Sequence, residues 1–314
     1  FKQKTAYEIK ECAWSSDVCS SDLIEDRRDG GDPGGGMSLP IPGGGGGLGI
    51  GAVILLTLIG WVIGVDPRIL IGGAEMVTGG RAPQQQVQPQ SPSRPQAPPT
   101  DEVGRFVAAI VGNNEDIWAE ILPAQKGIRF QPAPLVMFAG QTSSSCGRAQ
   151  SAMGPFYCPV DRKMYLDTSF FREMQRKFGG GGDAAYAYVI AHEMGHHIEN
   201  LLGILPKVQR AQQQASSQAE ANGLSVRVEL MADCLAGVWM AHSQRKGGGN
   251  VFNEEDLKKA INTATAIGDD TLQKAGRGYA VPDSFTHGSS EQRQRWLQQG
   301  MRSGQIDSCN TFSR

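Results

Sequence analysis

Three of the chain's five histidines lie within the stretch AHEMGHHIEN, residues 191–200. The surrounding run begins after a series of glycines at Asp183, a suitable N-cap residue, and ends at Gly203, so we expect a helix here. In a helix, residues four apart share a face, and His192 and His196 would lie about one turn apart. That separation lets two imidazoles hold one zinc ion.

Glu193 lies beside these histidines on the expected helix, where it can contact a zinc-bound water. The pattern His-Glu-x-x-His therefore combines two metal ligands with a general base. Gly195, inside the same pattern, would let another element approach the helix closely. His197 points about 100° away from His196, so we expect it just outside the ligand set or facing solvent. The alternative is a core helix that is merely rich in histidine, but three imidazoles are hard to bury without partners.

A catalytic zinc needs a third protein ligand and one open position. The longer motif with a third histidine would require it at position 202, which is Leu202. A second helical pattern, residues 225–239, has Glu229 and Asp233 four residues apart. We interpret Glu229 as the third ligand and Asp233 as the carboxylate that orients a ligand histidine. Glu220 is the alternative ligand, but its polar neighbours predict a solvated position.

The 314 residues divide into segments by composition. Residues 24–47 are dominated by a glycine run that cannot bury enough apolar surface to fold, so we expect a disordered cytoplasmic segment. Residues 66–100 are rich in proline and glutamine and predict an extended linker. Residues 101–314 have ordinary globular composition, enough for one domain with a sizeable core. The net charge of −2 and the scattered basic residues exclude a nucleic-acid-binding surface.

The first residues of the chain have an unusual origin. The segments KQKTAYEI and WSSDVCSSDL are what two stretches of a common sequencing adapter encode, in the right order. We therefore interpret residues 1–23 as translated adapter fused to a truncated natural start, and we leave them out of the fold prediction.

The stretch LGIGAVILLTLIGWVIGV, residues 48–65, contains no charged residue. Its length is at the lower end of the roughly 17–25 residues that span a bilayer as a helix. Trp61 lies near one end, as aromatic residues at membrane interfaces do. We expect a transmembrane helix with the N-terminus in the cytoplasm and the following domain outside. A cleaved signal peptide is the alternative.

Four cysteines remain after the first 23 residues: Cys146, Cys158, Cys234 and Cys309. They contain no CxxC pair, so a structural zinc ribbon is not supported. An even number fits two disulfides in an oxidising compartment, although four cysteines allow three pairings. We expect Cys146–Cys158 to close a short loop and Cys234–Cys309 to tie the C-terminal tail to a central helix. Four free thiols in a cytosolic protein are the alternative.

Taken together, HEMGHHIE, ELMADCLAGVW and FTHGSSEQRQRW resemble the neutral zinc metallopeptidases of bacteria, single-pass membrane proteins with a glycine-rich N-terminus. The similarity runs from about Ile24 to the end and includes EDRR, GVDP and GPFYCPVDRKMYLD. It implies an α+β, mainly helical fold, namely a zincin-like domain with a small edge sheet after one transmembrane helix. It also implies that His192, His196 and Glu229 bind one catalytic zinc ion and that Glu193 is catalytic.

Residues 154–167, GPFYCPVDRKMYLD, alternate in polarity as a strand entering the site helix would. In zincin-like domains an edge strand pairs with extended substrate, so we expect Phe156, Tyr157 and Tyr165 to contact a peptide. An ordinary core strand is the alternative.

The stretch THGSSEQRQRWLQQG predicts a helix near the C-terminus. Ser289 and Gln292 can form a capping box, and Gly300 predicts the end of the helix. His287 stands just before this helix and could stabilise a developing oxyanion, or it could only cap and pack. Arg293 is interpreted as structural, pairing with a carboxylate of the site.

These patterns favour an endopeptidase anchored in a bacterial cell membrane, in which a zinc-bound water attacks the peptide bond and Glu193 acts as general base. The expected partners are a peptide or protein substrate and the membrane. One alternative is a membrane-tethered scaffold with a structural zinc ion, for which Asp233 or His287 would supply a fourth ligand. The other is an interaction module that holds no metal.

Overall fold

The computed structural model describes residues 23–28, 99–150, 154–170, 182–243 and 252–313, all of which belong to one compact unit. Its strands are β1 (Ile24–Asp26), β2 (Leu135–Phe138), β3 (Gln141–Ser144), β4 (Gly147–Gln150), β5 (Phe156–Cys158) and β6 (Lys163–Asp167). Its α-helices are α4 (Glu102–Lys126), α6 (Asp183–Leu201), α7 (Ile204–Gln213), α8 (Gln218–His242), α9 (Glu254–Ala266), α10 (Asp269–Arg277) and α11 (Ser290–Ser303). Two 3₁₀ helices, η2 (Pro282–Ser284) and η3 (Ile306–Cys309), follow α10 and α11. The predicted α+β, mainly helical fold class is confirmed.

Several predicted segments fall outside the described part of the chain. These are residues 1–22, which we interpreted as translated adapter, the apolar run 48–65 and nearly all of the linker. Among the helices that the structure describes, none combines the length and the apolar character needed to cross a bilayer.

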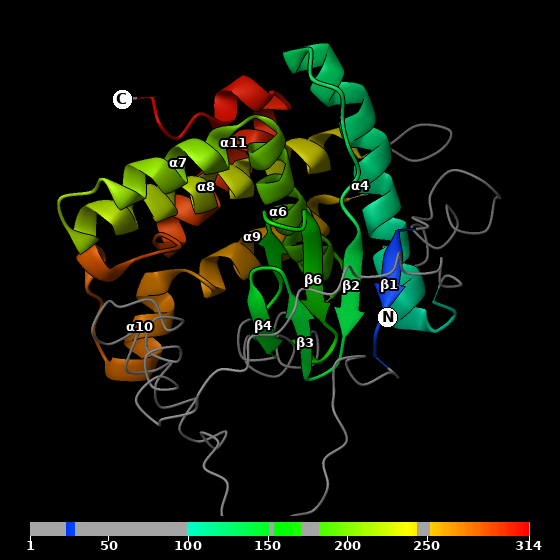
Figure 1. Ribbon diagram of the computed structural model, residues 1–314, viewed down its shortest axis with the longest axis horizontal. Coiled ribbons are helices and arrows are strands. Elements are labelled where there is room, and N and C mark those ends of the chain that lie inside the picture. Colours follow the sequence, from blue (N-terminus) through cyan, green and yellow to red (C-terminus); the bar gives the residue numbers. More distant parts are fainter. Residues whose placement is uncertain (1–22, 29–98, 151–153, 171–181, 244–251, 314) are drawn as a thin grey trace, which may run out of the picture. The chain divides into compact units, whose positions relative to one another are not determined.

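Four strands form a sheet in the order β1-β2-β6-β5, in which only β5 runs antiparallel to its neighbour. One face belongs to the main core, where Leu135 and Met164 pack with residues of α4 and α6. The other face carries Val136 and Tyr165 beneath Ala149 of the β3–β4 hairpin. Because both faces are covered, β2 is buried along its whole length. Figure 1 shows α4 on the β1 side of the sheet, with α7, α8 and α11 grouped on the other side of α6.

The expectation that residues 24–47 are disordered is wrong for residues 24–28. Ile24–Asp26 is strand β1, which pairs in parallel with β2, and the Ile24 side chain is only 4% exposed. The prediction of disorder was based on the long glycine run, which dominates the composition of residues 24–47. The pattern at its start, one apolar residue followed by charged residues, suits the edge strand of a sheet.

Residues 154–167 form a hairpin rather than the single strand that the sequence predicted. β5 and β6 pair antiparallel, with Phe156 opposite Tyr165. The turn between them begins at Pro159, which has no backbone N–H to donate to a neighbouring strand. It is closed by Asp161, whose side chain accepts a hydrogen bond from the Lys163 N–H at 3.2 Å.

Glycines set the distances between the three helices around the site. A Cβ atom on Gly195 of α6 would lie 2.9 Å from the Ala232 carbonyl oxygen of α8, which is the close approach expected from the sequence. A Cβ atom on Gly300 of α11 would lie 1.9 Å from the Cys234 carbonyl oxygen. Gly300 was predicted to end its helix, which is wrong. The helix continues to Ser303, and Gly304 provides the left-handed C-cap at φ 59°.

Both expected disulfides are present. Cys146–Cys158 joins the β3–β4 turn to β5, and Cys234–Cys309 joins α8 to η3. The second bond therefore ties the C-terminal tail to the helix that carries Glu229.

Candidate metal centre

The structure brings His192, His196 and Glu229 together. Each offers one ligand atom, and the three atoms lie within 4.8 Å of one another. Glu229 Oε2 is 3.1 Å from His192 Nε2, and Glu229 Oε1 is 3.6 Å from His196 Nε2. The pairing of α6 with α8 across Gly195 therefore gathers the three residues that the sequence selected as ligands.

Each of the two histidines has a carboxylate behind its ring. His192 Nδ1 is 2.9 Å from Asp233 Oδ1, and His196 Nδ1 is 2.8 Å from Glu199 Oε2. A hydrogen bond donated by Nδ1 leaves Nε2 unprotonated and turned towards Glu229. Two imidazole nitrogens and one carboxylate oxygen held in this way suit a zinc ion. Glu199 was not singled out in the sequence, although its place three residues after His196, on the same face, was a usable signal.

Asp233 is the centre of a buried polar network. Its Oδ1 accepts a hydrogen bond from the Tyr188 hydroxyl at 2.5 Å, and its Oδ2 accepts one from Arg293 Nε at 2.9 Å. Burial alone would raise the pKa of Asp233, but the charges of Arg293 and His192 outweigh it and lower that pKa to about 2. Both oxygens of the Asp233 carboxylate therefore already accept hydrogen bonds. Arg293 pairs with Asp233 as expected, whereas the hydrogen bond from Tyr188 was not predicted from the sequence.

Glu193 lies next to the ligands and is only 8% exposed. Burial raises its pKa above the usual value, against the lowering effect of His192 and His196. The backbone amide of Tyr157 in β5 lies close to this carboxylate and lowers its pKa. The edge of the four-stranded sheet therefore reaches the carboxylate predicted to act as the base.

His197 was expected just outside the ligand set or facing solvent. The structure excludes the solvent-facing position, because the residue is fully buried. Its Nδ1 is 3.0 Å from the Tyr157 hydroxyl, and its Nε2 is 2.5 Å from the Gln131 carbonyl oxygen. Asn200 also donates to the Tyr157 hydroxyl, at 3.0 Å. Because Tyr157 supplies the N–H that reaches Glu193, these contacts fix β5 against α6.

The other two residues predicted to contact substrate lie on the opposite face of the sheet from α6. The rings of Phe156 and Tyr165 stack with centroids 4.8 Å apart. Tyr165 is 2% exposed, and its hydroxyl donates to Asp161 at 2.8 Å. The structure thus brings the backbone of β5 to the site, but not the Tyr165 side chain.

His287 lies in a loop that packs against α8 beside Glu229. A Cβ atom on its neighbour Gly288 would lie 3.2 Å from Leu230. His287 Nδ1 is 3.3 Å from Asp269 Oδ1, and Asp269 Oδ2 accepts hydrogen bonds from three consecutive backbone N–H groups of the loop. Burial lowers the pKa of His287, but the carboxylates of Glu229 and Asp269 outweigh it and raise that pKa. Asp269, which holds the loop in place, was not predicted from the sequence.

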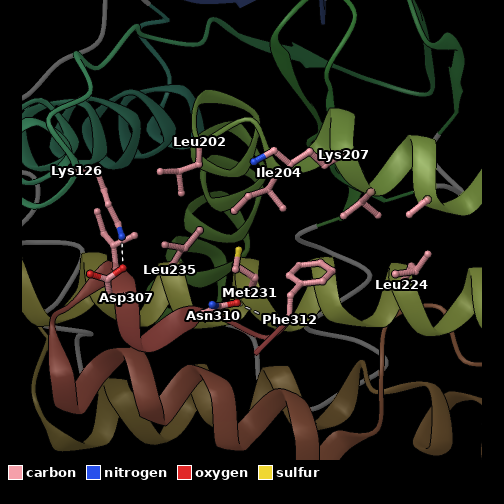
Figure 2. Close-up of a pocket in the computed structure, with 13 residues that line it drawn as sticks. Lys126, Leu202, Ile204, Lys207, Leu224, Met231, Leu235, Asp307, Asn310 and Phe312 are labelled. Atoms are coloured by element: carbon pink, nitrogen blue, oxygen red, sulfur yellow. Dashed lines mark hydrogen bonds and ion pairs between the residues drawn. The ribbon is translucent and has the colours of Figure 1, made fainter. Parts of the chain in front are cut away.

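A separate cavity of about 480 Å³ lies between α7 and α8. Met231 and Leu235 of α8 line it, and in a helix these positions face away from Glu229 and Asp233. Figure 2 shows Phe312 of the C-terminal tail beside them in this mostly apolar space. The cavity is therefore distinct from the metal centre.

The family to which the chain is similar is described as a zinc family, which agrees with the two histidines and one glutamate gathered at the site. The family described as "Putative neutral zinc metallopeptidase" matches residues 13–312. "Uncharacterized protein YpfJ" of Escherichia coli strain K12 is 46% identical over 296 residues, which cover 94% of this chain and 96% of that protein. "Uncharacterized protein Rv2575" of Mycobacterium tuberculosis is 39% identical over 224 residues, 68% of this chain and 73% of the relative. No solved structure matches. The chain belongs to this neutral zinc metallopeptidase family.

Proposed function

We propose that the protein is a zinc-dependent endopeptidase that is held at a bacterial membrane by the apolar run 48–65. The observation that carries the proposal is the arrangement of three donors, His192, His196 and Glu229, next to a buried glutamate. Three protein ligands leave a fourth position for water or substrate, as in catalytic rather than structural zinc sites.

Zinc in this site would supply a Lewis acid that polarises the scissile carbonyl and acidifies water. Glu193 would accept the proton of the attacking water and pass it to the leaving amine. Its raised pKa suits this role, because a base that later acts as an acid works best when its pKa is near the working pH.

The substrate is proposed to be an extended peptide that adds to β5. This strand lies at the sheet edge, and its Tyr157 N–H is already directed to Glu193. A peptide paired along β5 would therefore have its backbone close to the base and the zinc ligands. The backbone of Phe156 and Tyr157, rather than the buried ring of Tyr165, is the proposed contact.

His287 is proposed to stabilise the oxyanion that forms during the attack. Its side chain is 43% exposed beside a loop that Asp269 holds rigid. A raised pKa favours the protonated imidazole, a stronger hydrogen-bond donor to developing negative charge.

The structural-zinc alternative needs a fourth protein ligand, and Asp233 is a poor candidate because both of its oxygens are bound to Arg293, Tyr188 and His192. It also leaves Glu193 without a purpose. A metal-free interaction module leaves the two carboxylates behind the histidine rings unexplained.

Zinc content and cleavage of a quenched-peptide library by the purified full chain test the proposal. Glu193→Gln preserves shape and ligands but removes the base, so it should keep one zinc ion and lose cleavage. Glu220→Gln, an equivalent change at an exposed position of α8, is the control and should cleave like the parent. Zinc binding without cleavage by the parent would favour the structural-zinc alternative, and absence of zinc would favour the interaction module.

A further inference from the structure

Strand β1 is built into the core of the zinc domain, although a long stretch of chain separates it from the rest. Its register with β2 pairs Ile24 with Leu135 and Asp26 with Met137. The ladder continues beyond the strand at both ends, because the Leu135 N–H donates to the Leu23 carbonyl and the Arg27 N–H donates to the Met137 carbonyl.

The charged side chains of this segment all have partners. Glu25 forms ion pairs with Arg27, at 2.8 Å, and with Lys163 of β6. Arg27 also donates to Thr142 of the β3–β4 hairpin at 3.1 Å. The segment is thus matched to β6 and to the hairpin as well as to β2.

Arg28 connects the segment to the start of α4. It forms ion pairs with Asp26, at 2.5 Å, and with Asp101, the residue that caps α4. Burial raises the pKa of Glu25, but hydrogen bonds from Lys163 and Arg27 outweigh it and lower that pKa, and Arg28 lowers those of Asp26 and Asp101. The point where the chain leaves β1 is therefore joined directly to the point where it enters α4.

This junction restricts how the apolar run between them can meet a membrane. A span of this length crosses a bilayer once. One crossing would put residues 24–28 and the zinc domain on opposite faces, where β1 could not pair with β2. We infer that residues 23–28 and the domain that begins at residue 99 lie on the same side of the membrane, because β1 pairs with β2 and Arg28 pairs with Asp101. This arrangement rests on the proposed membrane attachment, and it differs from the orientation expected from the sequence, with the N-terminus inside and the domain outside.

Labelling of single cysteines in the full chain tests this topology. With Cys12 and Cys19 replaced by serine, Asp29→Cys reports on the chain just after β1. Tyr279→Cys, at a position 61% exposed, reports on the zinc domain. A membrane-impermeant maleimide should give the same result for both reporters. Either both are labelled in intact spheroplasts, or both are labelled only after lysis. Labelling of one in intact spheroplasts and of the other only after lysis would overturn the inference.

A protease assay on the same membranes tests the pairing itself. Trypsin should cleave after Arg27 and Arg28 only when the strand is released. With Lys2, Lys4 and Lys10 replaced by glutamine, loss of an N-terminal epitope tag reports that cut. Lys163→Glu places a second carboxylate next to Glu25 and should speed tag loss several-fold, and adding Glu25→Lys should slow it again. Lys258→Glu, a charge reversal at an exposed position of α9, is the control.

Equal tag loss in the parent, Lys163→Glu and the double variant would mean that Glu25 of β1 does not pair with Lys163 of β6 at the membrane, and would overturn the inference. Neither assay depends on zinc or on peptide cleavage. Failure here therefore leaves the peptidase proposal standing, and failure of that proposal leaves the topology standing.

Discussion

Glu199 supports His196 from within the same helix, three residues further along, with its Oε2 2.8 Å from the ring Nδ1. The side chain is fully buried, and its second oxygen, Oε1, has no hydrogen-bond partner among the described residues. Burial raises the pKa of Glu199 to about 7, against the lowering effect of His196. A carboxylate is costly to hold in such a place, and its contact with a candidate metal-binding histidine accounts for it.

We expect Glu199→Gln to weaken zinc binding by about 10- to 100-fold, because a residue that orients a ligand contributes on that scale. Competition with a coloured chelator would measure the affinity. Glu220→Gln on the exposed part of α8 should leave it unchanged. Equal zinc affinity in both variants would show that Glu199 has no part in positioning His196.

Replacement of Arg293 by methionine should destabilise the fold by about 3–5 kcal/mol, because it leaves the Asp233 carboxylate buried without its charged partner. Urea unfolding with the disulfides intact would measure the free energy. Arg295→Met, at an exposed position of the same helix, is the control and should change it by less than about 0.5 kcal/mol.

The contribution of the Asp233–Arg293 pair depends on pH. The pKa of Asp233 falls from 3.8 to about 2 on folding. A lowered carboxyl pKa stabilises the fold above the unfolded pKa, and this contribution is lost as the pH falls through 3.8 towards 2. The difference in stability between the parent and Arg293→Met should therefore shrink over that range, and a constant difference would contradict the pairing.

Two glycine substitutions test the packing of α11 on α8. Gly300→Ala puts a methyl group against the Cys234 carbonyl and should destabilise the fold by about 1–3 kcal/mol or more. Gly276→Ala in α10 meets nothing within 4 Å and should stabilise by about 0.5–1 kcal/mol through helix propensity. Thermal unfolding of the two variants should shift in opposite directions; an unchanged or higher unfolding temperature in Gly300→Ala would argue against the close contact.

His287→Ala should lower kcat by about 100- to 1000-fold, the usual effect of removing one donor to a developing oxyanion. KM and zinc content should stay close to those of the parent, because the side chain is not among the three candidate metal ligands. A change in KM alone, with kcat preserved, would assign His287 to substrate binding instead.

Local sequence patterns were enough for much of the candidate site. The four-residue spacing in α6 and α8 placed His192 beside His196 and Glu229 beside Asp233, because helical geometry is fixed over one turn. The capping box of Ser289 with Gln292 and the small residue at Gly195 were read correctly for the same reason. Both disulfide pairings were also confirmed.

Features that depend on distant parts of the chain were missed. Tyr188 and Asp269 acquire their roles only when α6, α10 and the loop before α11 meet. The burial of His197 required knowledge that β5 would bring the Tyr157 hydroxyl beneath α6. Strand β1 was not predicted because its three residues precede a glycine run, and the average composition of this region is that of a disordered segment. Gly300 was read as a helix end because a close helix contact and a C-cap both favour glycine.

X-ray absorption at the zinc edge of the purified full chain tests the central claim most directly. We expect one zinc ion with only nitrogen and oxygen neighbours at about 2.0–2.2 Å and the outer-shell scattering of two imidazoles. In Glu229→Gln, zinc binding should weaken more than in Glu199→Gln, because a direct ligand is changed. Sulfur at about 2.3 Å, or a third imidazole, would contradict a centre made by His192, His196 and Glu229.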